Sequence, residues 1–203
     1  MRSTIKSLMV ASILTFAGVA QVSADITLRY AEGGATRGTR AAAAQFFADE
    51  VERLSSGGLK VEIYWGGALL KLAAKTDGMS TGSADLGSVL SSYEPQELKA
   101  LGKLKALGIG EIPLEYSDPW VGMQAMYDLM TTEPELKQSL ADKSLFYLSS
   151  FGTTCVQFEC TEGNQIRTVD DIEGKRLRAT GTYSNVLADL EANMVGMPFN
   201  ELY

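Results

Sequence analysis

Two arginines, Arg176 and Arg178, are separated by a single residue in the segment 175–179. Side-chain alternation in this segment predicts a short strand that carries both arginines on one face. A guanidinium group offers a planar set of donors that matches the two oxygens of a carboxylate, and it keeps its charge when buried. The residue type therefore suits the binding of an organic acid, although a strand arginine in contact only with water is the alternative.

The sequence rules out several kinds of catalysis. It contains no histidine, which excludes Ser-His-Asp and Cys-His catalysis and histidine-ligated metals. It also has no glycine pattern of the P-loop or dinucleotide-binding kind,. Carboxylate chemistry remains an alternative, with Glu32 or Asp118 as acid or base, but nothing in the sequence pairs them. We expect a protein that is not an enzyme and needs no cofactor.

The two cysteines, Cys155 and Cys160, make a poor zinc site without histidine,. In a continuous strand their α-carbons would lie about 16 Å apart at ~3.3 Å per residue, whereas a disulfide needs them within about 7 Å. They can pair only if residues 156–159 form a turn. A disulfide and two separate thiols both remain open, and the sequence favours the thiols.

The N-terminus predicts export. Two basic residues precede an apolar run over residues 8–20, and small residues lead from there to Asp25. This pattern is typical of a signal peptide, residues 1–24, and the run is shorter than the ~20 apolar residues of a transmembrane helix. We expect a periplasmic protein without stable membrane insertion after cleavage; an uncleaved anchor is the alternative.

The acidic net charge of the chain bears on which kinds of partner it can bind. The 203 residues carry a formal charge of −7, and loss of residues 1–24 with their two basic residues leaves 16 basic against 25 acidic residues, or −9. An acidic chain disfavours nucleic acid and anionic membrane surfaces. An anionic ligand is still possible, because one arginine in a desolvated cleft outweighs a screened surface field.

The residues around Arg178 predict one strand–helix–strand unit, the building block of an α/β lobe. A helical turn begins at Thr168 and ends at Gly174, and the strand over residues 175–179 follows,. A helix comes next, and the chain is extended again from Val195. The apolar stripe of that helix consists of Leu187, Leu190 and Met194,.

The preceding part of the chain predicts more units of the same kind. Two of its helices carry apolar stripes that we assign to the core. We expect lobe 1 over residues 25–150, and a partial lobe 2 with a crossover segment over residues 151–203. The expected strands cover residues 26–30, 59–65, 86–90 and 145–148, and the expected helices cover residues 39–55, 68–80, 133–142 and a stretch that opens at Asp118-Pro119. The stripes are Ala43, Phe47, Val51 and Leu54, and Trp120, Met123, Tyr127 and Met130.

Polar residues follow two of the expected strands. A glycine-rich loop over residues 32–38 offers the backbone of Gly33 or the hydroxyl of Thr36 to a ligand; a flexible turn is the alternative. Ligands of open α/β sheets bind at the carboxyl ends of strands. Ser91 and Tyr93 are therefore candidates for pocket contacts, with an ordinary turn as the alternative.

Two patterns, DDIEGKRLRATG at residues 170–181 and VGMPFNELY at residues 195–203, resemble the solute-binding proteins of tripartite ATP-independent periplasmic (TRAP) transporters, C4-dicarboxylate type. The segment TGSADL at residues 81–86 fits the same family. The resemblance implies an α/β, two-lobed periplasmic-binding-protein-like fold with mixed sheets flanked by helices. It also implies that Arg178 forms a salt bridge with the carboxylate of a small organic acid, and that Phe199 lines the pocket.

The resemblance further implies that the protein passes its ligand to the membrane subunits of a TRAP transporter. A binding protein of another transporter class or a sensor ectodomain with the same fold is the first alternative. An exported carboxylate-based enzyme is the second.

The sequence departs from the family in two places. The register of a second arginine, present in sialic-acid-type members, falls on Phe158, which points to a smaller or more apolar carboxylate. The family continues for about another third of its length beyond Tyr203, so we expect a fragment with an incomplete second lobe. A tandem duplication, residues 98–102 and 104–108, has no functional interpretation.

Overall fold

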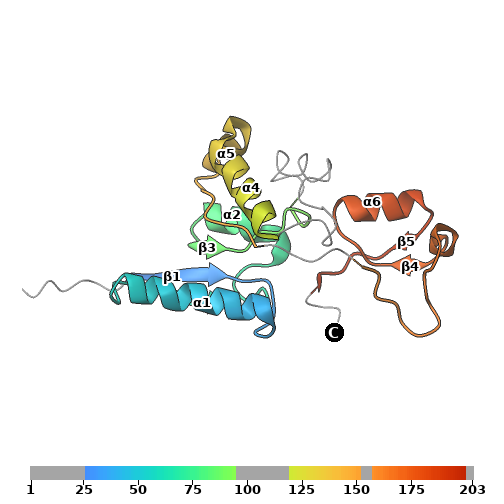
Figure 1. Cartoon of the computed structure of the whole chain (residues 1–203), viewed down its shortest axis with the longest axis horizontal. Coiled ribbons are helices and arrows are strands. Elements are labelled where there is room, and N and C mark those ends of the chain that lie inside the picture. The colour runs from blue at the N-terminus through green and yellow to red at the C-terminus, as the bar shows by residue number, and fades with distance from the viewer. Residues whose placement is uncertain (1–25, 95–118, 152–156, 200–203) are drawn as a thin grey trace, which may run out of the picture.

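The structure, a computed structural model, describes residues 26–94, 119–151 and 157–199. Its elements form two groups (Figure 1): one holds β1, α1, α2, β3, α4 and α5, and the other holds β4, α6 and β5. Each group has its own sheet, of three strands in the first and two in the second. Every strand pair in the described part of the chain is parallel. The α/β, two-lobed architecture expected from the sequence is confirmed.

The first sheet has the order β2-β1-β3. Strand β1 (Ile26–Ala31) pairs with β2 (Leu59–Tyr64) along its whole length, and with β3 (Leu86–Gly87) only at Tyr30 and Ala31. Parallel neighbours need a crossover. Helix α1 (Thr39–Leu54) connects β1 to β2, and the 3-10 turn η1 (Leu72–Ala74) with helix α2 (Lys75–Ser80) connects β2 to β3. The strand expected over residues 86–90 is thus two residues long.

Helix α1 begins and ends almost where the sequence predicts, because Gly57, at φ 83°, turns the chain after Ser55. The predicted core face is wrong. The buried residues are Ala41, Ala44 and Ala48, whereas Ala43 is exposed and Leu54 is 71% exposed. The small side chains of these alanines let the helix backbone lie close to the sheet. Larger residues of the predicted stripe, such as Leu54, therefore stay in contact with solvent.

The helix expected over residues 68–80 begins later, at Leu72 as a 3-10 turn and at Lys75 as α2. Gly66 and Gly67 both take positive φ, and their N–H groups donate to the carbonyls of Gly34 and Glu32 at 2.8 and 3.0 Å. These hydrogen bonds hold the residues after β2 against the loop after β1, so the helix begins only further along the chain.

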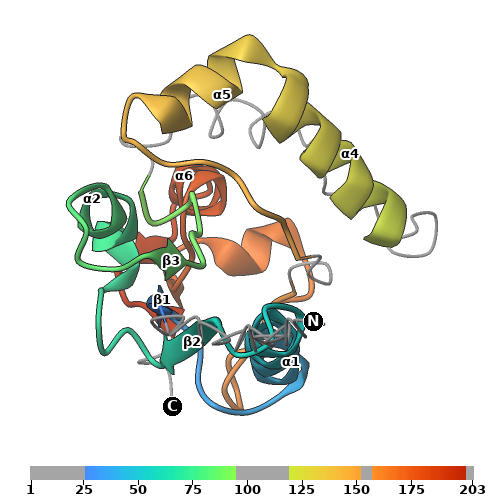
Figure 2. The same cartoon turned by 90° about the vertical axis from the view of Figure 1, so that its left-hand side faces the viewer.

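Helices α4 (Pro119–Thr132) and α5 (Pro134–Ala141) each start at a proline, which suits the first helical turn because the missing N–H is unneeded there. They form an arc away from α1 and β2 (Figure 2). The predicted core stripe of α4 is mostly wrong: Met130 is 5% exposed, but Trp120 is 69% exposed. Asp118 lies outside the described residues.

The strand expected over residues 145–148 does not form; residues 145–150 run as irregular chain. Phe146 is 78% exposed and Leu148 is 50% exposed. A strand needs a paired neighbour, and the described part of the chain places none beside this segment.

The second group is the predicted strand–helix–strand unit. Strand β4 (Arg176–Leu177) pairs in parallel with β5 (Asn193–Met194), and α6 (Thr182–Asp189) connects them. Before β4, the 3-10 turn η3 (Val169–Ile172) starts at a capping box, in which Thr168 and Asp171 satisfy each other's backbone N–H,.

Two details of this unit differ from the sequence prediction. Met194 lies in β5 and not on the helix stripe, because α6 ends at Asp189 and Glu191 then takes a left-handed φ of 62°. Leu187 and Ile172 form the buried part of the lobe, at 8% and 5% exposure. No helix in the described residues of either lobe is long and apolar enough to cross a membrane.

Candidate functional site

Arg178 follows β4 directly and is half-buried, whereas Arg176 is exposed. The Arg178 Nε–H donates to the carbonyl of Met197 at 2.7 Å, and Nη2 donates to the hydroxyl of Tyr93. The guanidinium carbon lies 6.0 Å from the centre of the Tyr93 ring. The second lobe therefore presents its half-buried arginine to a side chain of the first lobe, beyond the end of β3.

The Tyr93 hydroxyl accepts a second hydrogen bond, from the backbone N–H of Phe199 at 3.2 Å. Three of the residues singled out from the sequence, Arg178, Tyr93 and Phe199, thus meet at one hydroxyl group. A hydroxyl oxygen has two acceptor positions and one proton to donate. Both acceptor positions of Tyr93 are filled here, and its proton has no acceptor among the described residues.

The lobes also touch beside this group. The Thr180 and Ser92 hydroxyls are 3.5 Å apart. Gly181 has φ 59°, and a Cβ atom at that position would stand 3.0 Å from the Cβ of Ser92. A glycine is needed here for both its backbone conformation and the close approach of Ser92.

Glu32, at the end of β1, is 1% exposed and holds a second arginine. Its carboxylate accepts from the Gly34 N–H at 2.6 Å and the Tyr30 hydroxyl at 3.1 Å, and it forms an ion pair with Arg40. Burial acts to raise the pKa of Glu32, but the donors of Gly34, Ser88 and Arg40 outweigh it, and the pKa is lowered. Glu32 is therefore a poor general acid, because its proton is lost at a lower pH than that of an ordinary glutamic acid.

Arg40 lies in the first turn of α1 and reaches the second lobe. Its guanidinium carbon is 5.1 Å from the centre of the Phe151 ring and 5.6 Å from that of Phe199, within the range of a cation–π contact. Its Nε is buried and has no hydrogen-bond partner in the described structure. The sequence reasoning missed Arg40. Its one signal was its place directly after the glycine-rich loop.

Gly33 is packed against the side chains of η1 and α2. A Cβ atom there would stand 2.4 Å from Leu72 Cδ2 and 3.1 Å from Lys75 Nζ. Lys75 is fully buried and donates to the Ser88 carbonyl at 2.7 Å and to its hydroxyl at 3.0 Å. Burial lowers the pKa of Lys75 to about 8, although Glu32 and Glu94 oppose the shift. Gly33 has a structural role in this packing, and its contact with a ligand stays a prediction.

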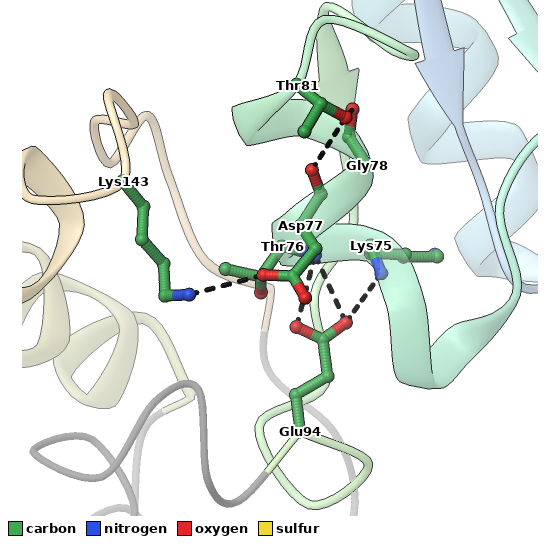
Figure 3. A network of polar contacts seen from close by, with 7 residues as sticks. All are labelled: Lys75, Thr76, Asp77, Gly78, Thr81, Glu94 and Lys143. Atoms are coloured by element: carbon green, nitrogen blue, oxygen red, sulfur yellow. Dashed lines mark hydrogen bonds and ion pairs between the residues drawn. The ribbon is translucent and has the colours of Figure 1, made fainter.

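Glu94 is 3% exposed and caps α2 (Figure 3). Its carboxylate accepts from the N–H of Lys75 at 2.8 Å and from that of Thr76 at 3.1 and 3.2 Å. An anion is favoured there, because the first N–H groups of a helix have no partner in the helix. Figure 3 also shows Lys143 and Asp77 in contact beside this cap, at 3.2 Å.

The remaining candidates lie apart or are incompletely placed. Phe158 is 53% exposed, and Thr36 is exposed. Ser91 is 4% exposed, and its hydroxyl has no partner in the described part of the chain. Cys160 is a free, exposed thiol, and Cys155 lies outside the described residues. Within the described ranges, no cluster of three or more acidic or cysteine side chains could hold a metal ion.

Comparison with known proteins supplies the family. Residues 31–203 match the family described as bacterial extracellular solute-binding protein, family 7. A curated solute-binding protein of Albidiferax ferrireducens is 29% identical over 164 residues, which cover 77% of this chain and 44% of that protein. The chain spans about half the length of the proteins it matches.

Two solved structures share the fold. A TRAP periplasmic solute-binding protein from Desulfovibrio salexigens is 25% identical, with a TM-score of 0.53 over 87% of this chain and 51% of that one. A marine metagenome TRAP solute-binding protein, specific for aromatic acids and bound to metahydroxyphenylacetate, is 23% identical, with a TM-score of 0.65 over 86% and 52%. The chain belongs to family 7 of the bacterial extracellular solute-binding proteins, the TRAP-type family expected from its sequence.

Proposed function

We propose that this protein captures a small organic acid by its carboxylate, between Arg178 and Tyr93. The observation that carries the proposal is the set of donors left over at that point. Arg178 uses Nε and Nη2 for protein contacts, and its Nη1 has no hydrogen-bond partner among the described residues. The Tyr93 proton is also uncommitted there. A carboxylate oxygen can accept from both.

The surroundings of these donors suit burial of the ligand. Phe199 lies beside Tyr93, and its ring also faces the Arg40 guanidinium. A binding pocket of this kind combines apolar and aromatic walls with a few polar groups that fix the ligand's orientation. The metagenome relative binds a hydroxyphenylacetate, a carboxylate on an aromatic body, which is the combination that Arg178, Tyr93 and Phe199 favour.

Membership of the family supports a proposed cellular role. The protein would be exported after cleavage of residues 1–24, and its two lobes, residues 25–150 and 151–203, would close on the ligand before it passes to the membrane subunits of a TRAP transporter. Contacts between lobes at Tyr93 and Ser92 fit closure by hinge bending. The intact mass of the exported protein checks the cleavage site: it should begin at Asp25.

The test is a thermal-shift and calorimetry screen of the chain against small organic acids, with Arg178→Ala and Arg176→Ala in parallel. A ligand at a hundredfold over its Kd should stabilise the protein by ~2.7 kcal/mol. Arg178→Ala should weaken binding by about 10- to 150-fold, since hydrogen bonds to charged groups contribute ~1.5–3 kcal/mol. Arg176→Ala removes an exposed arginine from the same strand and should change Kd less than about twofold.

Two outcomes would contradict the proposal. One is that no acid in the screen shifts the melting of the wild-type chain. The other is that Arg176→Ala and Arg178→Ala weaken binding equally, which would mean that general surface charge, and not a placed guanidinium, attracts the ligand.

A further inference from the structure

The charged side chains at and behind Phe199 divide into two sets. Arg40 faces the Phe199 ring and is ion-paired with Glu32. Lys75 interacts electrostatically with both and with Glu94. We call these four first-lobe residues, Glu32, Arg40, Lys75 and Glu94, the lobe-1 cluster. The fifth is Arg178 of the second lobe. The cluster holds two acids and two bases, so its formal charges cancel, while Arg178 adds a single positive charge.

The charge of Arg40 is committed inside the cluster. Its guanidinium is ion-paired with Glu32, a side chain that is 1% exposed and is fixed by two further donors, Gly34 N–H and Tyr30 hydroxyl. A buried carboxylate that loses its cation is strongly destabilised, because the remaining charge is left in a medium of low dielectric. Arg40 can therefore give up Glu32 for a ligand anion only at a large cost.

The other two members of the cluster are committed as well. Lys75 is fully buried, and its ammonium group donates to the carbonyl and the hydroxyl of Ser88. Glu94 accepts from the N-terminal N–H groups of α2. Neither side chain can move to a ligand without breaking buried hydrogen bonds.

Arg178 differs from all four. Its contacts are a carbonyl and a hydroxyl, both neutral, and no carboxylate lies within ion-pair distance in the described part of the chain. It is the half-buried cation whose charge a ligand would have to balance.

We propose that the site selects acids with one carboxylate over acids with two, and that Glu32 sets this selectivity by holding Arg40. The inference rests on the proposed function of Arg178. A second ligand carboxylate that reached past Phe199 would meet Arg40 already neutralised, with the Glu32 carboxylate behind it. That carboxylate would lose its water without gaining a cation, and like charges brought together in an interface are strongly unfavourable.

The test uses acids paired by size: butyrate with succinate, hexanoate with adipate, and 3-hydroxyphenylacetate with 3-carboxyphenylacetate. Kd is measured by calorimetry for each acid on the full chain. The wild type should bind at least one monocarboxylate at least about tenfold more tightly than its partner, and in no pair should the dicarboxylate bind more tightly. Tenfold corresponds to 1.4 kcal/mol.

Glu32→Gln then tests the role of Glu32. Glutamine keeps the shape and an acceptor for the Gly34 N–H but removes the charge, so Arg40 becomes available to the second carboxylate. The preference should shift toward the dicarboxylate by at least about tenfold. Glu50→Gln is the matched control. Glu50 lies on α1, the helix that carries Arg40, but it pairs with Arg53 and not with Arg40. It should leave the preference unchanged.

The possible results separate the two proposals. A wild type that binds dicarboxylates more tightly, in a manner lost in Arg178→Ala, overturns the inference and keeps the proposed function. An unchanged preference in folded Glu32→Gln overturns the role of Glu32. If Glu32→Gln does not fold, Arg40→Lys decides, because lysine keeps a positive charge beside Glu32 but loses the planar set of donors of arginine. A selective loss of dicarboxylate affinity in Arg40→Lys shows that Arg40 was binding the second carboxylate, which overturns the inference. Unchanged dicarboxylate affinity supports it. A chain that binds no acid overturns both.

Discussion

The two lobes use arginine in opposite ways. In the first lobe, Arg40 is held by a buried carboxylate and belongs to a set of charges that cancel. In the second lobe, Arg178 has only neutral partners among the described residues. The difference teaches that the type of residue does not decide its role: a cation with an internal counter-charge stabilises the fold, and one without it is left to recognise an anion.

Removal of Glu32 should produce the largest loss of stability. Glu32→Ala leaves the Arg40 guanidinium and the Gly34 N–H without their partner in a buried place, which should lower the free energy of unfolding by about 3–5 kcal/mol. Urea denaturation measures the loss. Glu62→Ala, at an exposed position of β2, serves as control and should cost under about 1 kcal/mol. Equal losses in both variants would mean that the Glu32 ion pair has no special weight.

Lys75 should give the first lobe an unusual dependence on pH. Its pKa is lowered to about 8 in the folded protein, from 10.5 for an unperturbed lysine. Between these values the unfolded chain binds more protons, so stability should rise with pH. The gain is at most about 3 kcal/mol by 1.36 kcal/mol per pKa unit.

The rise should be clearest from pH 8 to 10. Above that range Tyr30, whose pKa burial and Glu32 raise to about 12, opposes it, because the unfolded chain then loses the tyrosine proton first. Melting temperatures across this range, for wild type and Lys75→Met, provide the measurement. A rise of equal size in Lys75→Met would assign it to another group.

Arg178→Ala should cost the fold little. The variant loses hydrogen bonds to Met197 and Tyr93 at a half-buried position, so the free energy of unfolding should fall by about 1 kcal/mol. Unfolding is measured without ligand. A destabilisation as strong as that of Glu32→Ala would show that Arg178 stabilises the fold, and the proposed difference between the two arginines would be wrong.

The smallest effect is expected for an exposed pair. Arg53→Ala removes the contact with Glu50 at 2.6 Å on the surface of α1, and stability should change by less than about 0.5 kcal/mol. Unfolding in low and high salt gives the check. A larger change would show that exposed ion pairs of this chain also stabilise the fold. The buried Glu32–Arg40 pair would then be less distinct from them.

The sequence predicted those features that depend on local chemistry. The capping residue Thr168 located the turn before β4, and Gly57 located the end of α1. Tyr93 was singled out because it follows an expected strand, whereas Arg178 and Phe199 were assigned to the pocket by the family resemblance. The structure brings the three together. Their function in binding stays a prediction.

Features that depend on packing were missed. The buried face of α1 is the one that lets the helix pack closely on the sheet. Ala44 and Ala48 permit that close packing, which larger side chains would prevent. The Glu32–Arg40 pair joins a strand end to a helix start across a loop, a distance at which no helical or strand periodicity applies. The missing strand at residues 145–148 has the same cause, because pairing requires a neighbour that local sequence does not specify.

The order β2-β1-β3 has a consequence for the timing of folding. The first strand of the sheet to be synthesised, β1, occupies its centre, and its partners are Leu59–Tyr64 and Leu86–Gly87. Until the ribosome has released the chain beyond Gly87, the central strand lacks a neighbour on at least one edge. Non-local pairing of this kind slows folding. The N-terminus predicts export, and a slow-folding sheet would leave more time for export before the first lobe folds.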